Sequence, residues 1–119
     1  MTECLLIVDD ERDFCSNLSD VLGAFGYTTD VAYLARDALE LARRSKHRLA
    51  LLDFKLPCMT GVELFHQLRK VDQGIEAMLV TAFASLDTTQ AATAAGMRHV
   101  VEKPVDVPQL LALIDETLT

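Results

Sequence analysis

Six polar residues stand close behind short apolar runs of the sequence, and their types suit phosphoryl chemistry. They are Asp9, Asp10 and Glu11 after Leu5–Val8, Asp53 after Leu49–Leu52, Thr81 after Ala77–Val80, and Lys103 after Val100 and Val101. Carboxylates within a few ångströms of each other raise one another's pKa unless a cation is present. Oxygen ligands without thiolate or paired imidazole suit a hard divalent ion, above all Mg²⁺.

Magnesium usually takes only one or two protein carboxylates, so that one of these aspartates would remain free. A free carboxylate can attack phosphorus and form an aspartyl phosphate. A lysine and a hydroxyl can then neutralise and hydrogen-bond the phosphoryl oxygens. Each residue alone is more typical of a turn, a helix cap or the solvated surface, and only their joint placement favours this chemistry.

The apolar pattern predicts five strands that alternate with five helices. The strands are Leu5–Val8, Thr28–Ala32, Leu49–Leu52, Ala77–Val80 and the pair Val100 and Val101. Four helices show a buried face, made by Phe14, Leu18, Val21, Leu22 and Phe25, by Leu34, Ala38, Leu41 and Ala42, by Val62, Phe65 and Leu68, and by Leu110, Leu111, Ile114 and Leu118. The fifth is the alanine-rich segment Leu86–Ala95, which has few large anchors.

Local residues predict where several of these elements begin and end. Gly26 suits the end of the first helix, and Asp106 can cap the last one. Thr60 and Glu63 form a capping box, whereas Pro57 indicates a loop over Phe54–Met59.

Strict alternation of strands and helices predicts right-handed crossovers and a parallel sheet with helices on both faces. The predicted fold is α/β, a flavodoxin-like doubly wound sheet of five parallel strands in the order 2-1-3-4-5 with five helices. No internal repeat or linker divides the 119 residues, so we expect one domain over residues 1–119. Ligands of such sheets bind outside the carboxyl ends of the strands, where the polar residues stand.

Composition excludes several other classes of protein. Eleven basic and eighteen acidic residues give a net charge of −7, which argues against direct nucleic-acid binding by this domain. The sequence has neither a secretory signal nor an apolar run long enough for a bilayer, so we expect a cytoplasmic protein without membrane contact. Cys4, Cys15 and Cys58 predict neither a disulfide framework nor a zinc site, and the three histidines are too scattered to suggest a metal cage.

From Cys4 to Leu118 the sequence resembles the receiver domain of two-component response regulators. The motifs that carry the resemblance are Val8-Asp9-Asp10-Glu11, Leu52-Asp53-Phe54-Lys55-Leu56-Pro57, Met59-Thr60-Gly61, Val80-Thr81-Ala82 and Glu102-Lys103-Pro104. The resemblance implies that Asp53 accepts a phosphoryl group from a phosphohistidine on a sensor kinase or a phosphotransfer protein. It also implies a switch that regulates a downstream output, rather than an enzyme with a separate substrate, although the domain would assist its own phosphorylation and dephosphorylation.

The resemblance further implies a magnesium site held by Asp10, by Asp9 through water, by Asp53 and by the backbone carbonyl of Lys55. Such domains often pair, so a homodimer is one assembly to expect.

Three further residues take roles from the same resemblance. Thr81 would hydrogen-bond the phosphoryl oxygens, Lys103 would pair with the phosphoryl group, and Pro104 would follow a cis peptide bond, which is accessible to X–Pro bonds.

The sequence departs from the family pattern at Val100, where a Tyr or Phe is common. Valine is small and stiff at χ1, so it cannot report a movement of Thr81 by turning a ring inward. His99 could substitute as a reporter or be an ordinary exposed histidine. The resemblance places Lys55 and Phe83 at positions where the family tunes phosphoryl lifetime. It implies that Lys55 would screen the phosphoryl group and that Phe83 would hinder the attacking water.

Three alternative functions share single features with this sequence. A haloacid dehalogenase-type phosphatase needs a second carboxylate two residues after its nucleophile, and Lys55 stands there. A flavodoxin-type cofactor carrier needs a phosphate-cradling loop where the aspartates would repel the ligand. A receiver-like interaction module that is never phosphorylated is the remaining alternative. The sequence identifies neither the cognate kinase nor the output, and it is compatible with a single-domain regulator or with a segment of a longer protein.

Overall fold

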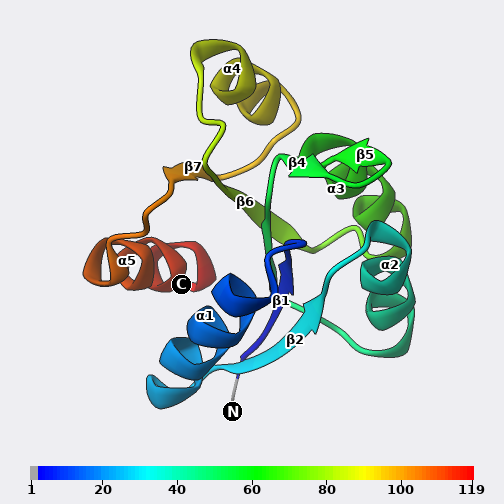
Figure 1. Ribbon diagram of the computed structural model, residues 1–119. Coiled ribbons are helices and arrows are strands. Elements are labelled where there is room, and N and C mark those ends of the chain that lie inside the picture. The colour runs from blue at the N-terminus through cyan, green and yellow to red at the C-terminus, as the bar shows by residue number, and fades with distance from the viewer. Residues whose placement is uncertain (1–2) are drawn as a thin grey trace.

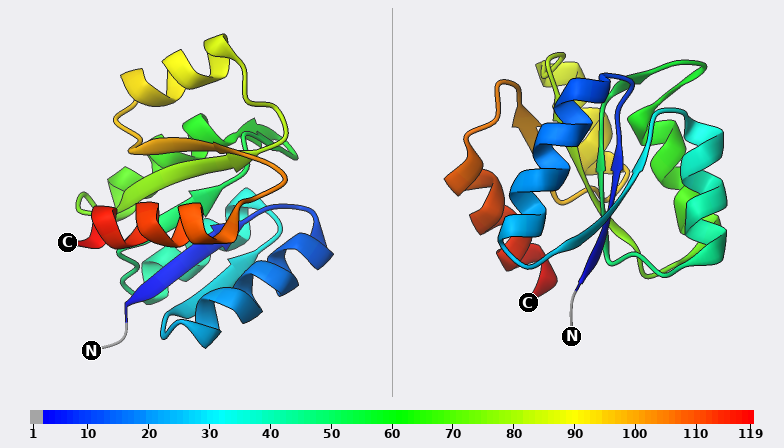
Figure 2. Two further views of the ribbon diagram at one scale, coloured as in Figure 1. Left: turned by 90° about the vertical axis from the view of Figure 1, so that its left-hand side faces the viewer. Right: turned by 60° about the horizontal axis from the view of Figure 1, so that its bottom comes forward.

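The computed structural model describes residues 3–119 as a β-sheet between two layers of helices (Figures 1 and 2). The elements in chain order are β1 (Cys4–Val8), α1 (Arg12–Ala24), β2 (Thr28–Ala32), α2 (Ala35–Arg44), β3 (Leu49–Leu52), β4 (Lys55–Leu56), β5 (Met59–Thr60), α3 (Gly61–Val71), β6 (Glu76–Thr81), α4 (Leu86–Ala94), β7 (His99–Glu102) and α5 (Val107–Leu118). The first two residues of the predicted domain lie outside the described residues.

The main sheet has the strand order β2-β1-β3-β6-β7, and all its neighbouring strands are parallel. Counted within the main sheet, this is the predicted order 2-1-3-4-5. The central strands β1 and β3 are buried on both faces, which is why their sequences are short continuous apolar runs. Five α-helices over residues 3–119 complete the predicted α/β fold.

The core forms two layers, one on each face of the sheet. Leu6 and Val8 of β1 belong to the layer beneath α2 and α3, whereas Leu5 and Ile7 belong to the layer beneath α1 and α5. Alternate residues of one strand thus supply opposite layers, as the pleat requires. Figure 2 shows α1 and α5 on one side of the sheet and α2 and α3 on the other.

The alanine-rich helix α4 contributes little to either layer. Its buried residues are Thr88 and Ala92, and Leu86 at its first turn is 72% exposed. A helix with so few buried apolar anchors has a low local stability.

The predicted helix ends agree with the structure except at Phe25. The Thr60 side chain accepts from the Glu63 amide while Glu63 reaches back, and Asp106 caps α5 by accepting from Gln109 N–H. Gly26 has a φ of +93° just beyond α1. The prediction that Phe25 lies on the buried face was wrong, because α1 ends at Ala24 and Phe25 is 63% exposed.

The predicted loop over Phe54–Met59 contains two short paired segments. Lys55 and Leu56 pair antiparallel with Thr60 and Met59, so β4 and β5 form a small hairpin. The chain reverses at Pro57 and Cys58, and Cys58 has a positive φ of 73°. A two-residue pairing of this kind leaves no hydrophobic period that a sequence pattern could reveal.

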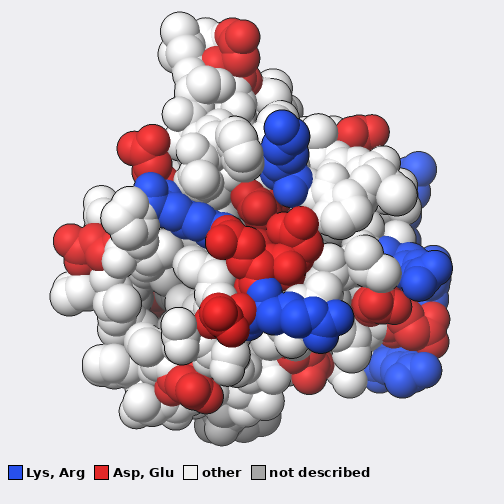
Figure 3. Space-filling model, in the orientation of Figure 1, with Lys and Arg blue, Asp and Glu red and all other residues white. Residues whose placement is uncertain are grey.

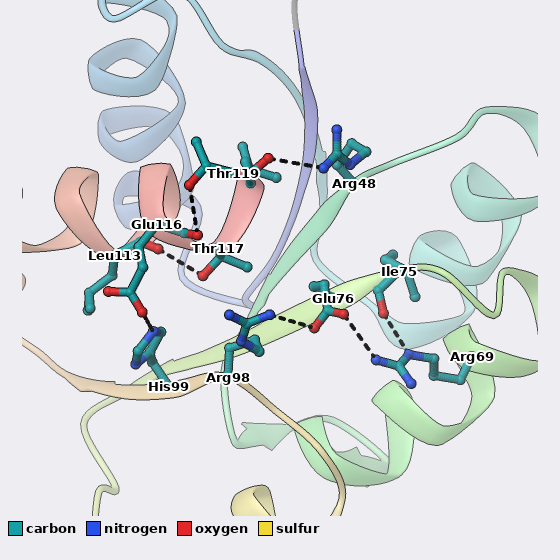
Figure 4. Close-up of polar contacts among 11 residues, drawn as sticks. Arg48, Arg69, Ile75, Glu76, Arg98, His99, Leu113, Glu116, Thr117 and Thr119 are labelled. Atoms are coloured by element: carbon teal, nitrogen blue, oxygen red, sulfur yellow. Dashed lines mark hydrogen bonds and ion pairs between the residues drawn. The ribbon is translucent and has the colours of Figure 1, made fainter.

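Opposite the carboxyl ends of the strands, charged residues link β6, β7 and α5 (Figure 4). Glu76 lies between Arg69 and Arg98, at 3.7 Å and 3.8 Å. His99 Nε2 lies 3.7 Å from Glu116 Oε1 of α5, and its side chain is only 27% exposed. His99 is therefore not the ordinary exposed histidine that was one of its two interpretations.

In the described part of the chain, no helix combines the length and apolar character needed to cross a membrane.

Candidate functional site

Asp9, Asp10 and Asp53 meet at the carboxyl ends of β1 and β3. One carboxylate oxygen from each lies within 4.8 Å of the others. The backbone explains the approach, because Asp53 N–H donates to the Val8 carbonyl at 3.0 Å and so joins the ends of the two strands. Figure 3 shows acidic side chains gathered in the middle of this face, with basic side chains beside them.

Asp9 is almost completely buried, with 1% of its surface exposed. Burial raises the pKa of Asp9, and the charge of Asp53 raises it as well. Hydrogen bonds from Lys103 and from Glu11 N–H partly oppose this rise. Clustered carboxylates of this kind are stabilised in their charged form by nearby cations and by the hydrogen bonds that they accept.

Lys103 supplies one such cation from the end of β7. Its ammonium donates to Asp9 Oδ2 and to Glu11 Oε1, both at 2.7 Å, and it lies 4.2 Å from the centroid of the Phe14 ring. Burial alone would lower the pKa of Lys103, but the hydrogen bonds to Asp9 and Glu11 outweigh it and raise the pKa. Lys103 is therefore charged at neutral pH. The Lys103–Pro104 peptide bond is cis, as the resemblance implied.

Asp53 is 5% exposed, and its Oδ1 has no hydrogen-bond partner within residues 3–119. A buried carboxylate oxygen without a partner is costly. The three carboxylates offer only oxygen donors, so this set fits a hard divalent cation better than a soft one.

A pocket of about 520 Å³ opens in front of Asp53. Asp10, Asp53, Lys55, Ala82 and Phe83 are among the residues that line it. The Lys55 ammonium lies 4.9 Å from the centroid of the Phe83 ring, and the ring is 51% exposed at the entrance. The two residues predicted to tune phosphoryl lifetime are thus in contact with each other.

Thr81 lies at the end of β6 and is completely buried. Its Oγ1 accepts a hydrogen bond from Phe83 N–H at 3.1 Å, and its carbonyl accepts from Lys103 N–H at 2.9 Å. Thr81 therefore joins the loop before α4 to the residue that carries the ammonium.

Sequence reasoning missed three contributors to this site. Phe14 lies beneath the Lys103 ammonium, and the Cys15 thiol donates to the Asp9 carbonyl at 3.3 Å. At Gly61 an added Cβ would overlap the backbone carbonyl oxygen of Asp53 and lie 3.0 Å from Leu79 Cδ2. The Met59-Thr60-Gly61 motif was quoted for the resemblance, but only the packing reveals why a glycine is needed there.

An open parallel sheet with an acidic pocket, a buried hydroxyl and an ammonium at its carboxyl end defines a class of phosphoacceptor domain. The chain belongs to the response regulator receiver domain family, which it matches over residues 5–115. It is thus a receiver domain of two-component response regulators.

Individual relatives agree with this assignment. The chain is 43% identical to a response regulator receiver protein of Anaeromyxobacter. The aligned region covers 91% of this chain and 45% of the length of that protein. It therefore spans about half the length of that relative. A receiver domain protein from Methanospirillum hungatei is 33% identical, with a TM-score of 0.93 over 99% of this chain and 94% of that one. A response regulator from Burkholderia pseudomallei, solved with a phosphorylated aspartic acid and a calcium ion, is 27% identical, with a TM-score of 0.87 over 93% and 65% of the two chains.

Proposed function

We propose that Asp53 is the phosphoacceptor of this receiver domain and takes its phosphoryl group from a histidine kinase or a histidine phosphotransfer protein. The observation that carries the proposal is the buried Asp53 carboxylate, whose Oδ1 has no hydrogen-bond partner in the described chain and which lines an open pocket. An Asp53 oxygen would form the new bond to phosphorus. The bond from phosphorus to the donor histidine would break, and its electron pair would stay on the imidazole nitrogen.

We infer that Mg²⁺ is the metal of the site, held by Asp9, Asp10 and Asp53 together with the backbone carbonyl of Lys55. When bound, such an ion neutralises charge on the phosphoryl oxygens. The all-oxygen donor set and the orphan oxygen of Asp53 support this choice. The calcium-containing relative from Burkholderia pseudomallei is consistent with a divalent cation in this family.

Thr81 and Lys103 would recognise the phosphorylated state. The Thr81 hydroxyl uses a lone pair for Phe83 N–H and keeps its own proton to donate to a phosphoryl oxygen. Lys103 would leave Glu11, which is 63% exposed and holds it weakly, to pair with the added charge.

These movements would act on α4 and on the loop before it. The loop is joined to Thr81 through Phe83 N–H, and α4 has few buried anchors. Val100 carries no ring, so the signal would travel through the backbone of this loop rather than through an aromatic switch. The cytoplasmic location, the single domain over residues 1–119 and the homodimer remain predictions from the sequence.

The test is incubation of the protein with Mg²⁺ and acetyl phosphate, followed by intact-mass measurement. We expect one base-labile phosphoryl group, lost in Asp53→Asn and retained in Asp106→Asn, an acidic control at the α5 cap. A protein that gains no phosphoryl mass would support the unphosphorylated interaction module instead, and labelling that persists in Asp53→Asn would show that another residue is the acceptor.

A further inference from the structure

Cys4, Asp30 and His47 lie together away from the phosphoryl site, although the sequence separates them widely. The register of β1 and β2 pairs Cys4 with Thr28, which brings Cys4 close to Asp30. His47 follows α2 and precedes β3. Its Nε2 lies 2.8 Å from Asp30 Oδ2, and the Cys4 thiol donates to the same oxygen at 3.9 Å.

The spatial arrangement of these three side chains excludes a role for Cys4 as a nucleophile. In a nucleophilic pair the imidazole contacts the sulfur and withdraws its proton. Here the carboxylate lies between the two groups. Burial raises the pKa of the Cys4 thiol, and the charge of Asp30 raises it further, so the sulfur remains a thiol at neutral pH.

We propose that Cys4, Asp30 and His47 form a second metal site, which takes a borderline divalent cation of the Zn²⁺ and Co²⁺ class. Sulfur, imidazole nitrogen and carboxylate oxygen are the donors that such ions prefer, whereas Mg²⁺ prefers oxygen alone. One potential ligand atom from each residue lies within 4.8 Å of the other two. Ligands around a tetrahedral zinc stand roughly 3.3–3.6 Å apart. The two distances to Asp30 Oδ2, 2.8 Å from His47 Nε2 and 3.9 Å from Cys4 Sγ, therefore need to change by only about half an ångström.

The side chains of the proposed site differ in their exposure to solvent, which suits a bound ion. The His47 side chain is fully buried and held in place, whereas 38% of the Asp30 side chain is exposed. The exposed side offers an entry path and room for a water as the fourth ligand. This site differs from the acidic pocket both in its place on the sheet and in its donor set.

The proton balance of binding is simple. The thiol proton leaves to solvent as the sulfur binds the cation, and the Nε2 proton is replaced by one on Nδ1. His47 Nδ1 is buried and has no hydrogen-bond partner within residues 3–119, so it is free to take the proton. The hydrogen bond between Nε2 and Asp30 is then exchanged for bonds from both groups to the cation. The cation then faces a thiolate, a carboxylate and a neutral imidazole, and its charge is balanced.

Cobalt is the probe, because a thiolate bound to Co²⁺ gives a charge-transfer absorption that oxygen ligands cannot give. The reduced protein is titrated with Co²⁺ in the presence of excess Mg²⁺, which occupies oxygen-only sites. We expect this absorption to saturate at one equivalent and to disappear when Zn²⁺ is added. Absence of the absorption at millimolar cobalt would overturn the proposal and leave the cluster a structural hydrogen-bond link.

Four variants locate the site. Cys4→Ser is expected to abolish the absorption, whereas Cys58→Ser, which removes the exposed thiol, is expected to keep it. Asp30→Asn is expected to weaken cobalt binding by at least about tenfold. Because Asp30 is partly exposed, this variant decides the matter if circular dichroism shows that Cys4→Ser does not fold. Asp53→Asn is expected to keep the absorption, so failure of the phosphoacceptor proposal and failure of this one are distinguishable.

Discussion

Gly61→Ala should both destabilise the protein and slow its phosphorylation. The added methyl group would overlap the Asp53 carbonyl oxygen and lie 3.0 Å from Leu79 Cδ2, so either the backbone of the acceptor or the start of α3 must move. Neither can give way easily, because Gly61 N–H donates to the Phe54 carbonyl at 2.7 Å and Thr60 caps the helix.

The size of the effect can be estimated from this geometry. Overpacking of a well-packed site costs about 1–3 kcal/mol. With an unfolding entropy of about 2.1 cal/mol/K per residue, the Tm of a chain of this size should fall by about 4–12 °C. A displacement of about 1 Å at a reacting group can slow a reaction by about 100-fold, which sets the upper limit for the loss in phosphorylation rate.

The assay combines a thermal melt with the time course of phosphorylation by acetyl phosphate. Gly23→Ala is the matched control, because Gly23 lies in α1 and a Cβ there would meet nothing within 4 Å. That variant should gain about 0.5–1 kcal/mol from better helix propensity and react at the parent rate. If Gly61→Ala melts at the parent temperature and phosphorylates at the parent rate, the close contact with Asp53 has no consequence and the reasoning is refuted.

Three other predictions test the electrostatics and the accessibility of the site. Asp9→Asn should raise the Tm at pH 7 without divalent ions, because burial raises the folded-state pKa of Asp9 and its charged form opposes folding. This gain in Tm should shrink as the pH falls through the raised pKa of Asp9, and it should vanish below the ordinary value of 3.8. An Asp9→Asn variant that is less stable than the parent at pH 7 would contradict this account. Phe83→Ala should speed dephosphorylation about 2- to 5-fold. The change removes the ring at the entrance of the pocket and a contact with Lys55 worth about 0.5–1 kcal/mol. An unchanged phosphoryl half-life would show that Phe83 does not hinder the attacking water. A thiol reagent should modify the exposed Cys58 at once and Cys15 only on unfolding, because Cys15 is buried and burial raises its pKa to about 11; peptide mapping that finds both labelled at one rate would show that α1 opens readily.

The sequence predicts the sheet well because its central strands carry an unambiguous pattern. A run such as Leu49–Leu52, buried on every residue and followed by a polar group, suits a strand in the middle of a parallel sheet. Helix caps such as Thr60 and Asp106 are equally local, since the donor and acceptor lie three residues apart. The alternation of strands and helices then predicts a parallel doubly wound sheet, for which the order 2-1-3-4-5 is one of the common solutions.

The details that escaped prediction depend on distant partners or on very few residues. The pairing of Lys55 with Thr60 spans too few positions to produce a period, and the exposure of Phe25 depends on where α1 stops. The proximity of Cys4 and His47 was not predicted, because it arises from strand register and from the loop after α2, which no spacing rule encodes. The placement of Asp9, Asp53, Thr81 and Lys103 was predictable because each stands at or directly after the carboxyl end of a strand of the same sheet.

The span between Asp9 and Lys103 has a consequence for the protein while it is being made. These two residues are joined by a direct contact although they lie 94 positions apart. A ribosome that has just added Asp53 must still add fifty residues before Lys103 exists. At a synthesis rate of about 5–20 residues per second, this takes roughly 3–10 seconds. During that interval the nascent polypeptide carries its aspartates without their ammonium, so a fragment that ends before Lys103 would lack the ion pair to Asp9.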